Sequence, residues 1–289
     1  MKRHAWLFNS DSTITNLNVR KIKDMKDRII NSNIAHITLI LSMILISCLT
    51  DSGREGSGSK YLNRLTRAEK KEGWKLLFDG KKFDGWRGLG RDHVPVGLWV
   101  IENGMIKKVD TGNQKNLPDG RPIEGGDLMT VDTYENYELK FEWKVNKGGN
   151  SGLKYNVSEE MSQEYGSGYS ALGFEYQLLD DGDEKYMRVL KPAQFSGSLY
   201  DLIPSKNVNL KPVGEFNSSR IIVNGNHAEH WLNGIKVVEY EFGSEELEDA
   251  YLASKFSEIP GFINKRKAHI VLQNHNDESW FRNIKIRVL

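Results

Sequence analysis

The stretch ENYELKFEWKV, residues 135–145, alternates large apolar side chains with charged ones. Because successive side chains of a β-strand point to opposite faces, this pattern predicts a strand with one buried face and one polar face. The buried face would carry Tyr137, Leu139, Phe141, Trp143 and Val145. The polar face would carry Glu138, Lys140, Glu142 and Lys144. Such a strand is typical of an antiparallel sheet that packs one side on a core.

Similar strand patterns, separated by turn signals, recur along the chain. They cover residues 74–78, 98–101, 105–109, 153–157, 173–179, 220–223, 230–232, 235–242, 269–274 and 280–288. Asn103-Gly104 and Asn233-Gly234 predict hairpin turns, and residues 148–152 (GGNSG) predict a further turn. Helices are expected at 62–72 and at 244–257, the second with Ser244 as its N-cap. The pattern predicts an all-β fold, a two-sheet antiparallel β-sandwich with one or two short helices.

Length and charge restrict the class of partner. The chain has 289 residues and a formal net charge of +1. A β-sandwich of about 200 to 250 residues commonly forms one domain, so one large domain over 72–289 is the natural interpretation. A nearly neutral chain without long charged runs gives no reason to expect nucleic acid, and an uncharged small molecule or a glycan fits better. Nothing in the sequence indicates an oligomeric state.

The N-terminal region predicts a lipoprotein signal. Residues 34–46 (IAHITLILSMILI) have the length of a signal-peptide apolar region and follow several basic residues. Residues 45–48 (LISC) resemble a bacterial lipobox, which would make Cys48, the single cysteine, the lipidated residue. Met25 is a more usual start for such a signal than Met1. We therefore expect an extension and signal over 1–48, a tether and short helix over 49–71, and a lipid-anchored protein of the cell envelope. A buried or anchoring hydrophobic helix is the alternative.

Three predicted strands carry unusual polar side chains opposite their apolar ones. The pairs are Glu142 with Lys144, Glu175 with Gln177, and Gln273 with His275. On any single strand, a solvated face is the simplest interpretation. Glutamine and histidine paired with glutamates are less typical of a surface selected for solubility, so the three pairs together predict a shared polar site.

No cofactor is required on sequence grounds. Nucleotide-binding glycine motifs, the GxSxG motif of serine hydrolases and the HExxH motif of zinc proteases are missing from the sequence. One acidic cluster could offer oxygen ligands to a divalent cation such as calcium, although a loop without metal is the simpler interpretation. It consists of Asp180, Asp181, Asp183 and Glu184. His227 and His230 show no metal-ligand spacing and are expected to be solvated.

Six motifs together resemble the 3-keto-disaccharide hydrolase domain family, formerly a domain of unknown function and common in bacterial lipoproteins. They are GWKLLFDGKKFDGW (73–86), FEWKVNKGGNSGLKYNV (141–157), GFEYQLLDD (173–181), GSLYDLIP (197–204), EHWLNGIKVVEYE (229–241) and LQNHNDESWFRNIKIR (272–287). The resemblance covers about 72–289. It implies a concanavalin A-like (lectin/glucanase) jelly roll with a cleft across its concave sheet, where the polar faces would converge.

The resemblance also implies a reaction, the cleavage of glycosides whose sugar is already oxidised to a ketone at C3. A C3 ketone acidifies the C2 proton, so a base can remove it, the C1 leaving group departs, and water is then added. For acid and base we expect His275, with Glu175 as the alternative base and Glu142 as its competitor. Lys144 and Lys154 could stabilise the enolate. Side chains expected to hold the sugar are Gln177, Gln273, Asn150 and Tyr200.

Two other functions remain open at this point. The same sandwich serves as a lectin in other proteins, so a non-catalytic carbohydrate-binding module is one alternative. Ordinary glycoside hydrolysis needs two carboxyl groups about 5 to 9.5 Å apart, and Glu142 with Glu175 could provide them. Convergence of the polar side chains on one point would favour catalysis.

Overall fold

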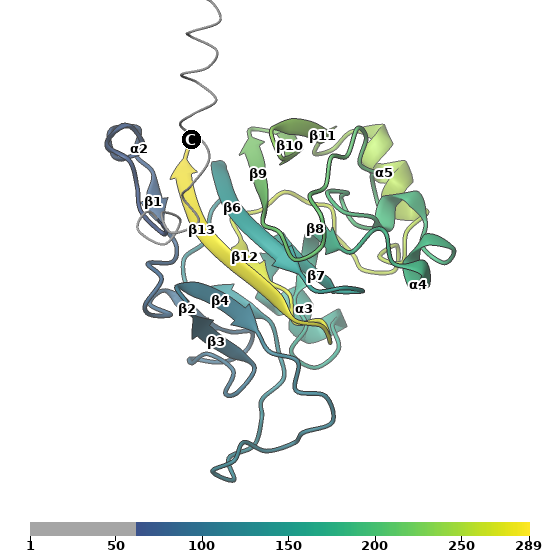
Figure 1. The fold of residues 1–289 in the computed structure, drawn as a ribbon. Helices are drawn as coiled ribbons and strands as arrows, with labels where there is room; N and C mark the ends of the chain where they lie inside the picture. Colours follow the sequence, from purple (N-terminus) through teal and green to yellow (C-terminus); the bar gives the residue numbers. More distant parts are fainter. Residues whose placement is uncertain (1–61) are drawn as a thin grey trace, which may run out of the picture. The chain divides into compact units, whose positions relative to one another are not determined.

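The computed structural model describes residues 62–289, and its strands form two antiparallel sheets (Figure 1). The larger sheet has eight strands in the order β11, β10, β9, β6, β13, β4 and β3, with β1 paired to β13. These strands are β1 (Lys75–Leu76), β3 (Trp99–Glu102), β4 (Met105–Lys108), β6 (Tyr137–Val145), β9 (Asn217–Asn224), β10 (His227–Leu232), β11 (Ile235–Glu241) and β13 (Ser279–Val288).

The smaller sheet has five strands in the order β2, β5, β12, β7 and β8. They are β2 (Trp86–Gly88), β5 (Leu128–Thr130), β7 (Asn150–Ser158), β8 (Leu172–Leu179) and β12 (His269–Leu272). In Figure 1, β12 passes behind β13 of the larger sheet. The all-β, two-sheet antiparallel sandwich expected from the sequence is confirmed.

The main core lies between the two sheets. The five apolar side chains of β6 are at most 4% exposed, as their alternation predicts. They belong to one cluster with Leu153 and Tyr155 of β7 and with Phe174 and Tyr176 of β8. Phe141 and Tyr176 meet edge to face, with ring centroids 5.6 Å apart, which joins the sheets directly.

A polar chain also crosses this core. The Tyr155 hydroxyl lies 2.7 Å from His230 Nε2 and 2.9 Å from the Tyr240 hydroxyl, and His230 Nδ1 lies 2.9 Å from the carbonyl of Gly197. Because a carbonyl can only accept, Nδ1 carries the proton and Nε2 accepts from Tyr155. Burial lowers the pKa of His230 to about 4, so the ring is neutral. His230 therefore connects the sheets, and the expectation that it is solvated is wrong.

Short helices connect the strands in the described part of the chain. They are α2 (Arg67–Lys71), α3 (Glu159–Tyr165), α4 (Glu184–Met187), α5 (Glu245–Leu252) and the 3₁₀ turn η2 (Pro192–Gln194). The first is shorter than expected because Thr66 caps it, accepting from the Glu69 backbone N–H at 3.1 Å. Ser244 caps α5 as predicted, but this helix ends at Leu252, so the residues up to 257 form a loop.

The two predicted Asn-Gly hairpin turns are confirmed. Asn103 and Gly104 have φ values of 52° and 75°, and Asn233 and Gly234 have 48° and 85°. These left-handed conformations suit asparagine and glycine. The turn predicted over 148–152 is shorter than expected, because Asn150 already pairs with Leu179 at the start of β7.

The predicted signal peptide, Cys48 and most of the tether lie outside the described residues. None of the helices within 62–289 has the length and apolar character that crossing a membrane requires.

The polar chain through the core can be tested with tyrosine variants. Tyr155→Phe should lower the free energy of unfolding by about 1 to 3 kcal/mol, because it leaves His230 Nε2 buried without a donor. Urea unfolding measures the change. Tyr137→Phe is the control, since the buried Tyr137 hydroxyl has no partner among the described residues and its removal should cost little. Equal losses for both variants would contradict this role of Tyr155.

Candidate active site

Polar side chains gather on the outer face of the five-stranded sheet. Glu175 of β8 points away from the core because its neighbours Phe174 and Tyr176 point into it. Lys154 of β7 lies opposite Glu175 in the strand register. Gln273 follows the end of β12, and its backbone N–H donates to the carbonyl of Gly152 at 2.9 Å. Three adjacent strands thus bring these side chains to one place.

Glu175 is held against the sheet by Gln273 and by a glycine. Gln273 Nε2 donates to a Glu175 carboxylate oxygen at 2.9 Å. A Cβ atom on Gly152 would lie 2.5 Å from the other carboxylate oxygen, closer than atoms can approach. Only glycine at this position lets the carboxylate lie across β7.

Burial dominates the ionisation of Glu175. The side chain is 8% exposed, and burial raises its pKa to about 7, with a further contribution from Asp127. Lys154, Lys255 and the Gln273 amide act in the opposite direction by favouring the charged carboxylate. A carboxyl group with a pKa of about 7 can take up and release a proton near neutral pH.

Lys154 is a buried cation with its own partners. Its ammonium donates to Asp127 at 3.0 Å, to the carbonyl of Ala171 at 2.9 Å and to the Ser170 hydroxyl at 3.4 Å. Lys154 is 4% exposed and Asp127 is 1% exposed. With its three N–H groups occupied, Lys154 has none to offer a sugar or an enolate, and it acts on Glu175 through its charge.

His275 lies beside Asn150, as a member of the same polar face. Asn150 Nδ2 is 3.4 Å from His275 Nε2, and the Asn150 backbone N–H donates to Asp277 at 3.1 Å. Burial lowers the pKa of His275, although Asp277 opposes this, so the ring is neutral near pH 7. His275 Nδ1 faces the Asp277 carboxylate at 3.7 Å. Gln273 Oε1 is buried without a hydrogen-bond partner among the described residues, so this atom is available to a ligand.

Gln177 and Tyr200 border Glu175 in different ways. Gln177 Nε2 donates to the carbonyl of Gln194 at 3.2 Å, and its Oε1 accepts from the Leu178 backbone at 3.1 Å, so both ends are engaged within the protein. The Tyr200 backbone N–H donates to the Glu175 carbonyl at 2.9 Å. Burial, with a smaller contribution from Glu175, raises the pKa of Tyr200 to about 12, so its hydroxyl stays protonated.

Asp127 and Lys255 are site residues that the sequence did not indicate. Asp127 follows two glycines before β5 and resembles an ordinary loop acid. Lys255 falls within the helix expected over 244–257, where a lysine is usually solvated, but the loop after α5 brings its ammonium over the Tyr200 ring, 4.4 Å from the centroid. No sequence pattern marks either residue.

The expectation that Glu142 and Lys144 converge with Glu175 is wrong. Both belong to β6, a strand of the eight-stranded sheet, and their side chains lie on the outer face of that sheet. Glu142 accepts from Arg282 Nε at 2.7 Å, and the Lys144 ammonium lies 4.6 Å from the Trp280 ring centroid. The two-carboxylate hydrolysis that paired Glu142 with Glu175 is therefore excluded by their placement on opposite outer faces.

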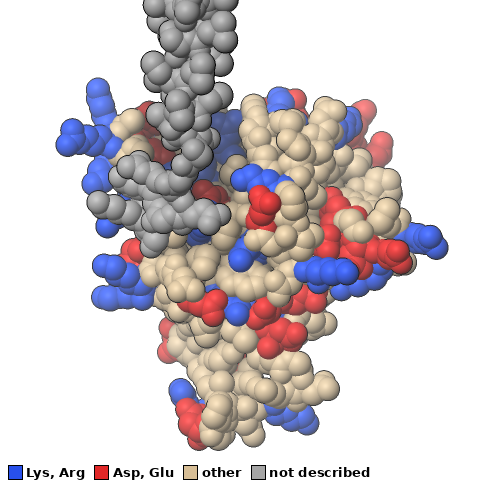
Figure 2. Space-filling model, in the orientation of Figure 1, with Lys and Arg blue, Asp and Glu red and all other residues tan. Residues whose placement is uncertain are grey.

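The outer face of the eight-stranded sheet has a separate set of charged groups. A cavity of about 430 Å³ there is lined by Glu142, Arg220 and Trp231 among others. Arg220 stacks on the Trp231 ring at 4.1 Å and lies 3.3 Å from Glu138. In Figure 2, basic and acidic side chains are interspersed over the visible face, which agrees with such local ion pairs.

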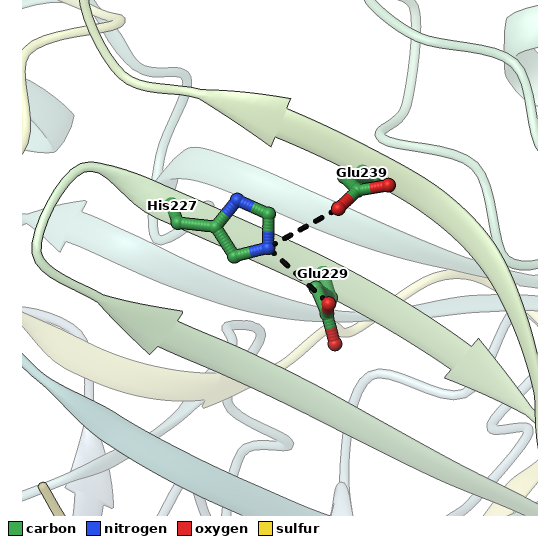
Figure 3. Close-up of side chains that lie close together, drawn as sticks. All are labelled: His227, Glu229 and Glu239. Carbon is green, nitrogen blue, oxygen red and sulfur yellow. Dashed lines mark hydrogen bonds and ion pairs between the residues drawn. The ribbon is translucent and has the colours of Figure 1, made fainter.

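One group of side chains within residues 62–289 has the spacing of metal ligands (Figure 3), and its strands belong to the eight-stranded sheet, whereas Glu175 belongs to the other. His227 Nε2 is 3.2 Å from Glu229 and 3.4 Å from Glu239, on β10 and β11. Lys236 already supplies a cation to both carboxylates, at 3.3 and 2.8 Å. Glu229 and Glu239 lie directly opposite in the register, where like charges need a counter-charge. We interpret the cluster as an ion-pair network.

The acidic cluster after β8 is used by the backbone. Asp180 accepts from the Gly148 N–H at 2.7 Å, Asp181 from the Ser196 N–H at 3.0 Å and Asp183 from the Lys185 N–H at 3.0 Å, where it caps α4. These backbone hydrogen bonds stabilise the loop.

Comparison with known proteins agrees with this fold. Residues 73–287 match the model of the 3-keto-alpha-glucoside-1,2-lyase-like domain. A 3-keto-disaccharide hydrolase of Bacteroides thetaiotaomicron is 35% identical over 283 residues, covering 85% of this chain and 94% of that protein. The crystal structure of a candidate glycosyl hydrolase from Parabacteroides distasonis has a TM-score of 0.65 and 31% identity, covering 79% of this chain and 99% of that one. A second from that organism has a TM-score of 0.55 and 26% identity, covering 75% and 99%.

The cost of keeping Glu175 buried can be measured. Its pKa in the folded protein, about 7, lies above the ordinary value of 4.5, so the stability that the protonated form contributes is present below pH 4.5 and is lost as the pH rises through 7. Glu175→Gln should therefore raise the melting temperature relative to the wild type more at pH 8 than at pH 5. Glu142→Gln, on the other sheet, controls for removal of an outer-face carboxylate. A difference that does not change with pH would contradict a raised pKa.

Proposed function

Because the chain belongs to the 3-keto-alpha-glucoside-1,2-lyase-like domain family and is a glycoside hydrolase-like enzyme, we propose that it cleaves 3-keto-glycosides or 3-keto-disaccharides by elimination and hydration. The family assignment made from the sequence is confirmed. The observation that carries the proposal is the buried Glu175, with a pKa of about 7, fixed by Gln273 beside two lysines.

Glu175 is the proposed base and acid of the elimination. Its carboxylate takes the C2 proton, the C–H electrons form the C2–C3 double bond, and the ketone oxygen becomes an enolate. The enolate oxygen then re-forms the C3 ketone, and the electrons of the C2–C3 double bond form a C1–C2 double bond. The C1–O bond breaks, and the leaving oxygen takes the proton back from Glu175. One group can serve both steps because its pKa lies near the working pH.

His275 is the proposed base of the hydration. Its neutral ring can take a proton from the water that attacks C1, which returns the electrons to the enolate, and it then gives this proton to C2. Asn150 and Gly152 are successive outward-facing positions on β7, roughly 6.5 Å apart along the strand. Asn150 lies beside His275, and Gly152 lies against the Glu175 carboxylate. That spacing suits two groups acting on one sugar ring.

The remaining polar groups are proposed to hold the sugar. Gln273 Oε1, which is buried without a partner among the described residues, would accept from a sugar hydroxyl. Asn150 would orient His275 and a neighbouring hydroxyl. Gln177 supports the segment around Gln194 instead, because both ends of its amide are engaged within the protein.

We also propose that the protein is a lipid-anchored lipoprotein of the cell envelope. The support is the apolar run over 34–46 followed by the lipobox-like residues 45–48. Expression in a bacterium with labelled palmitate should label the wild type and leave Cys48→Ala unlabelled and released from the membrane fraction. Equal labelling of both proteins would contradict the anchor.

Activity separates the proposed function from sugar binding alone. The wild type should cleave a nitrophenyl 3-keto-glucoside and leave the matched native glucoside intact, with kcat/KM falling as the pH drops below about 7 because Glu175 must be ionised. Glu175→Gln should lower kcat/KM at least about 100-fold. His275→Asn should let the unsaturated ketone accumulate, which NMR detects.

The control for this assay is Glu142→Gln, which changes a carboxylate on the opposite sheet and should keep wild-type turnover. Binding of the keto-glucoside without cleavage by the wild type would instead support a carbohydrate-binding module, and cleavage of the native glucoside would support ordinary hydrolysis.

A further inference from the structure

We propose that Lys255 is a catalytic residue of this site, whose ammonium stabilises the enolate oxygen formed at C3 of the sugar. This inference rests on the proposed function. Neither the sequence motifs nor the matched family description indicates the residue.

The backbone around Lys255 is fixed by neighbouring side chains. Its N–H donates to Asp201 at 2.8 Å, which ties the loop after α5 to the segment that carries Tyr200. The next residue, Phe256, is 8% exposed and stacks on Phe262, with ring centroids 4.1 Å apart. The side chain of Lys255 therefore starts from a rigid point.

The ammonium of Lys255 is directed over the Tyr200 ring, 4.4 Å from its centroid. The backbone N–H of Tyr200 in turn donates a hydrogen bond to the Glu175 carbonyl. An aromatic ring attracts a cation without using its N–H groups. Since this ammonium has no hydrogen bond or ion pair with any of residues 62–289, its three donors are free for a ligand.

Two other lysines, one beside Glu175 and one beside Asp201, are less suited to this role. Lys154 uses its three N–H groups on Asp127, Ala171 and Ser170. The Lys191 ammonium is already paired with the Asp201 carboxylate, at 3.8 Å. Among the described residues that interact electrostatically with Glu175, Lys255 is thus the cation with free donors.

The charges of Glu175 and Lys255 are complementary during the reaction. Before the elimination, the negative charge is on the Glu175 carboxylate, which Lys255 favours. When Glu175 takes the C2 proton, the carboxyl becomes neutral and the negative charge moves to the C3 oxygen. A cation that interacts with both positions keeps a counter-charge throughout the reaction. Because Tyr200 stays protonated, its hydroxyl can donate a hydrogen bond but carries no charge.

The test compares Lys255→Met with Lys255→Arg and with Lys191→Met as the matched control. With a nitrophenyl 3-keto-glucoside, Lys255→Met should lower kcat at least about 100-fold with a smaller change in KM, because the enolate forms only during the reaction. It should also slow exchange of the C2 hydrogen in D₂O. Lys255→Arg should recover part of the rate, and Lys191→Met should behave as the wild type.

A second readout does not depend on turnover. Loss of Lys255 removes a charge that favours the Glu175 carboxylate, so Lys255→Met should raise the pKa of Glu175, measured by NMR of labelled glutamate, and Lys191→Met should not. Wild-type kcat and C2 exchange in Lys255→Met would overturn the role of Lys255 while leaving the proposed function intact. Failure of the wild-type protein to cleave or exchange the keto-glucoside would overturn both.

Discussion

The buried ion pair between Lys154 and Asp127 is the contact on which the outer face of the five-stranded sheet depends. Asp127 accepts from Lys154 at 3.0 Å and also from the backbone N–H groups of Ala171 and Asn274, at 2.9 and 2.7 Å. It thus connects β7, the segment before β8 and the segment after β12. Loss of one partner would leave an uncompensated buried charge, which typically costs about 3 to 5 kcal/mol. The pair holds in place the segments from which Glu175 and Gln273 extend.

The same pair sets the electrostatics beside Glu175. Lys154 contributes positive charge and Asp127 partly cancels it, so burial prevails and the pKa of Glu175 rises to about 7. A free lysine in place of the pair would favour a carboxylate that is always ionised, which would be a weaker base. The arrangement therefore combines a rigid anchor with a carboxyl group that exchanges protons near neutral pH.

The site was only partly predictable from sequence. Alternation correctly placed Glu175, Gln177 and Gln273 on a polar face, since a two-residue period is a local property of a strand. It also selected Glu142, whose strand alternates in the same way but belongs to the other sheet. Lys255 was hidden because a helix pattern continued past the point where α5 ends.

The strands, the Asn-Gly hairpins and the all-β class follow from the order of residues, because alternation and left-handed turn conformations depend on near neighbours. Which outer face holds the site follows only from tertiary structure, because strand order joins β8, β7 and β12 in one sheet and leaves β6 in the other. The pKa of Glu175 is likewise a tertiary property. It depends on burial, and on charges contributed by Lys154, Asp127 and Lys255, which meet through pairing of segments distant in the chain.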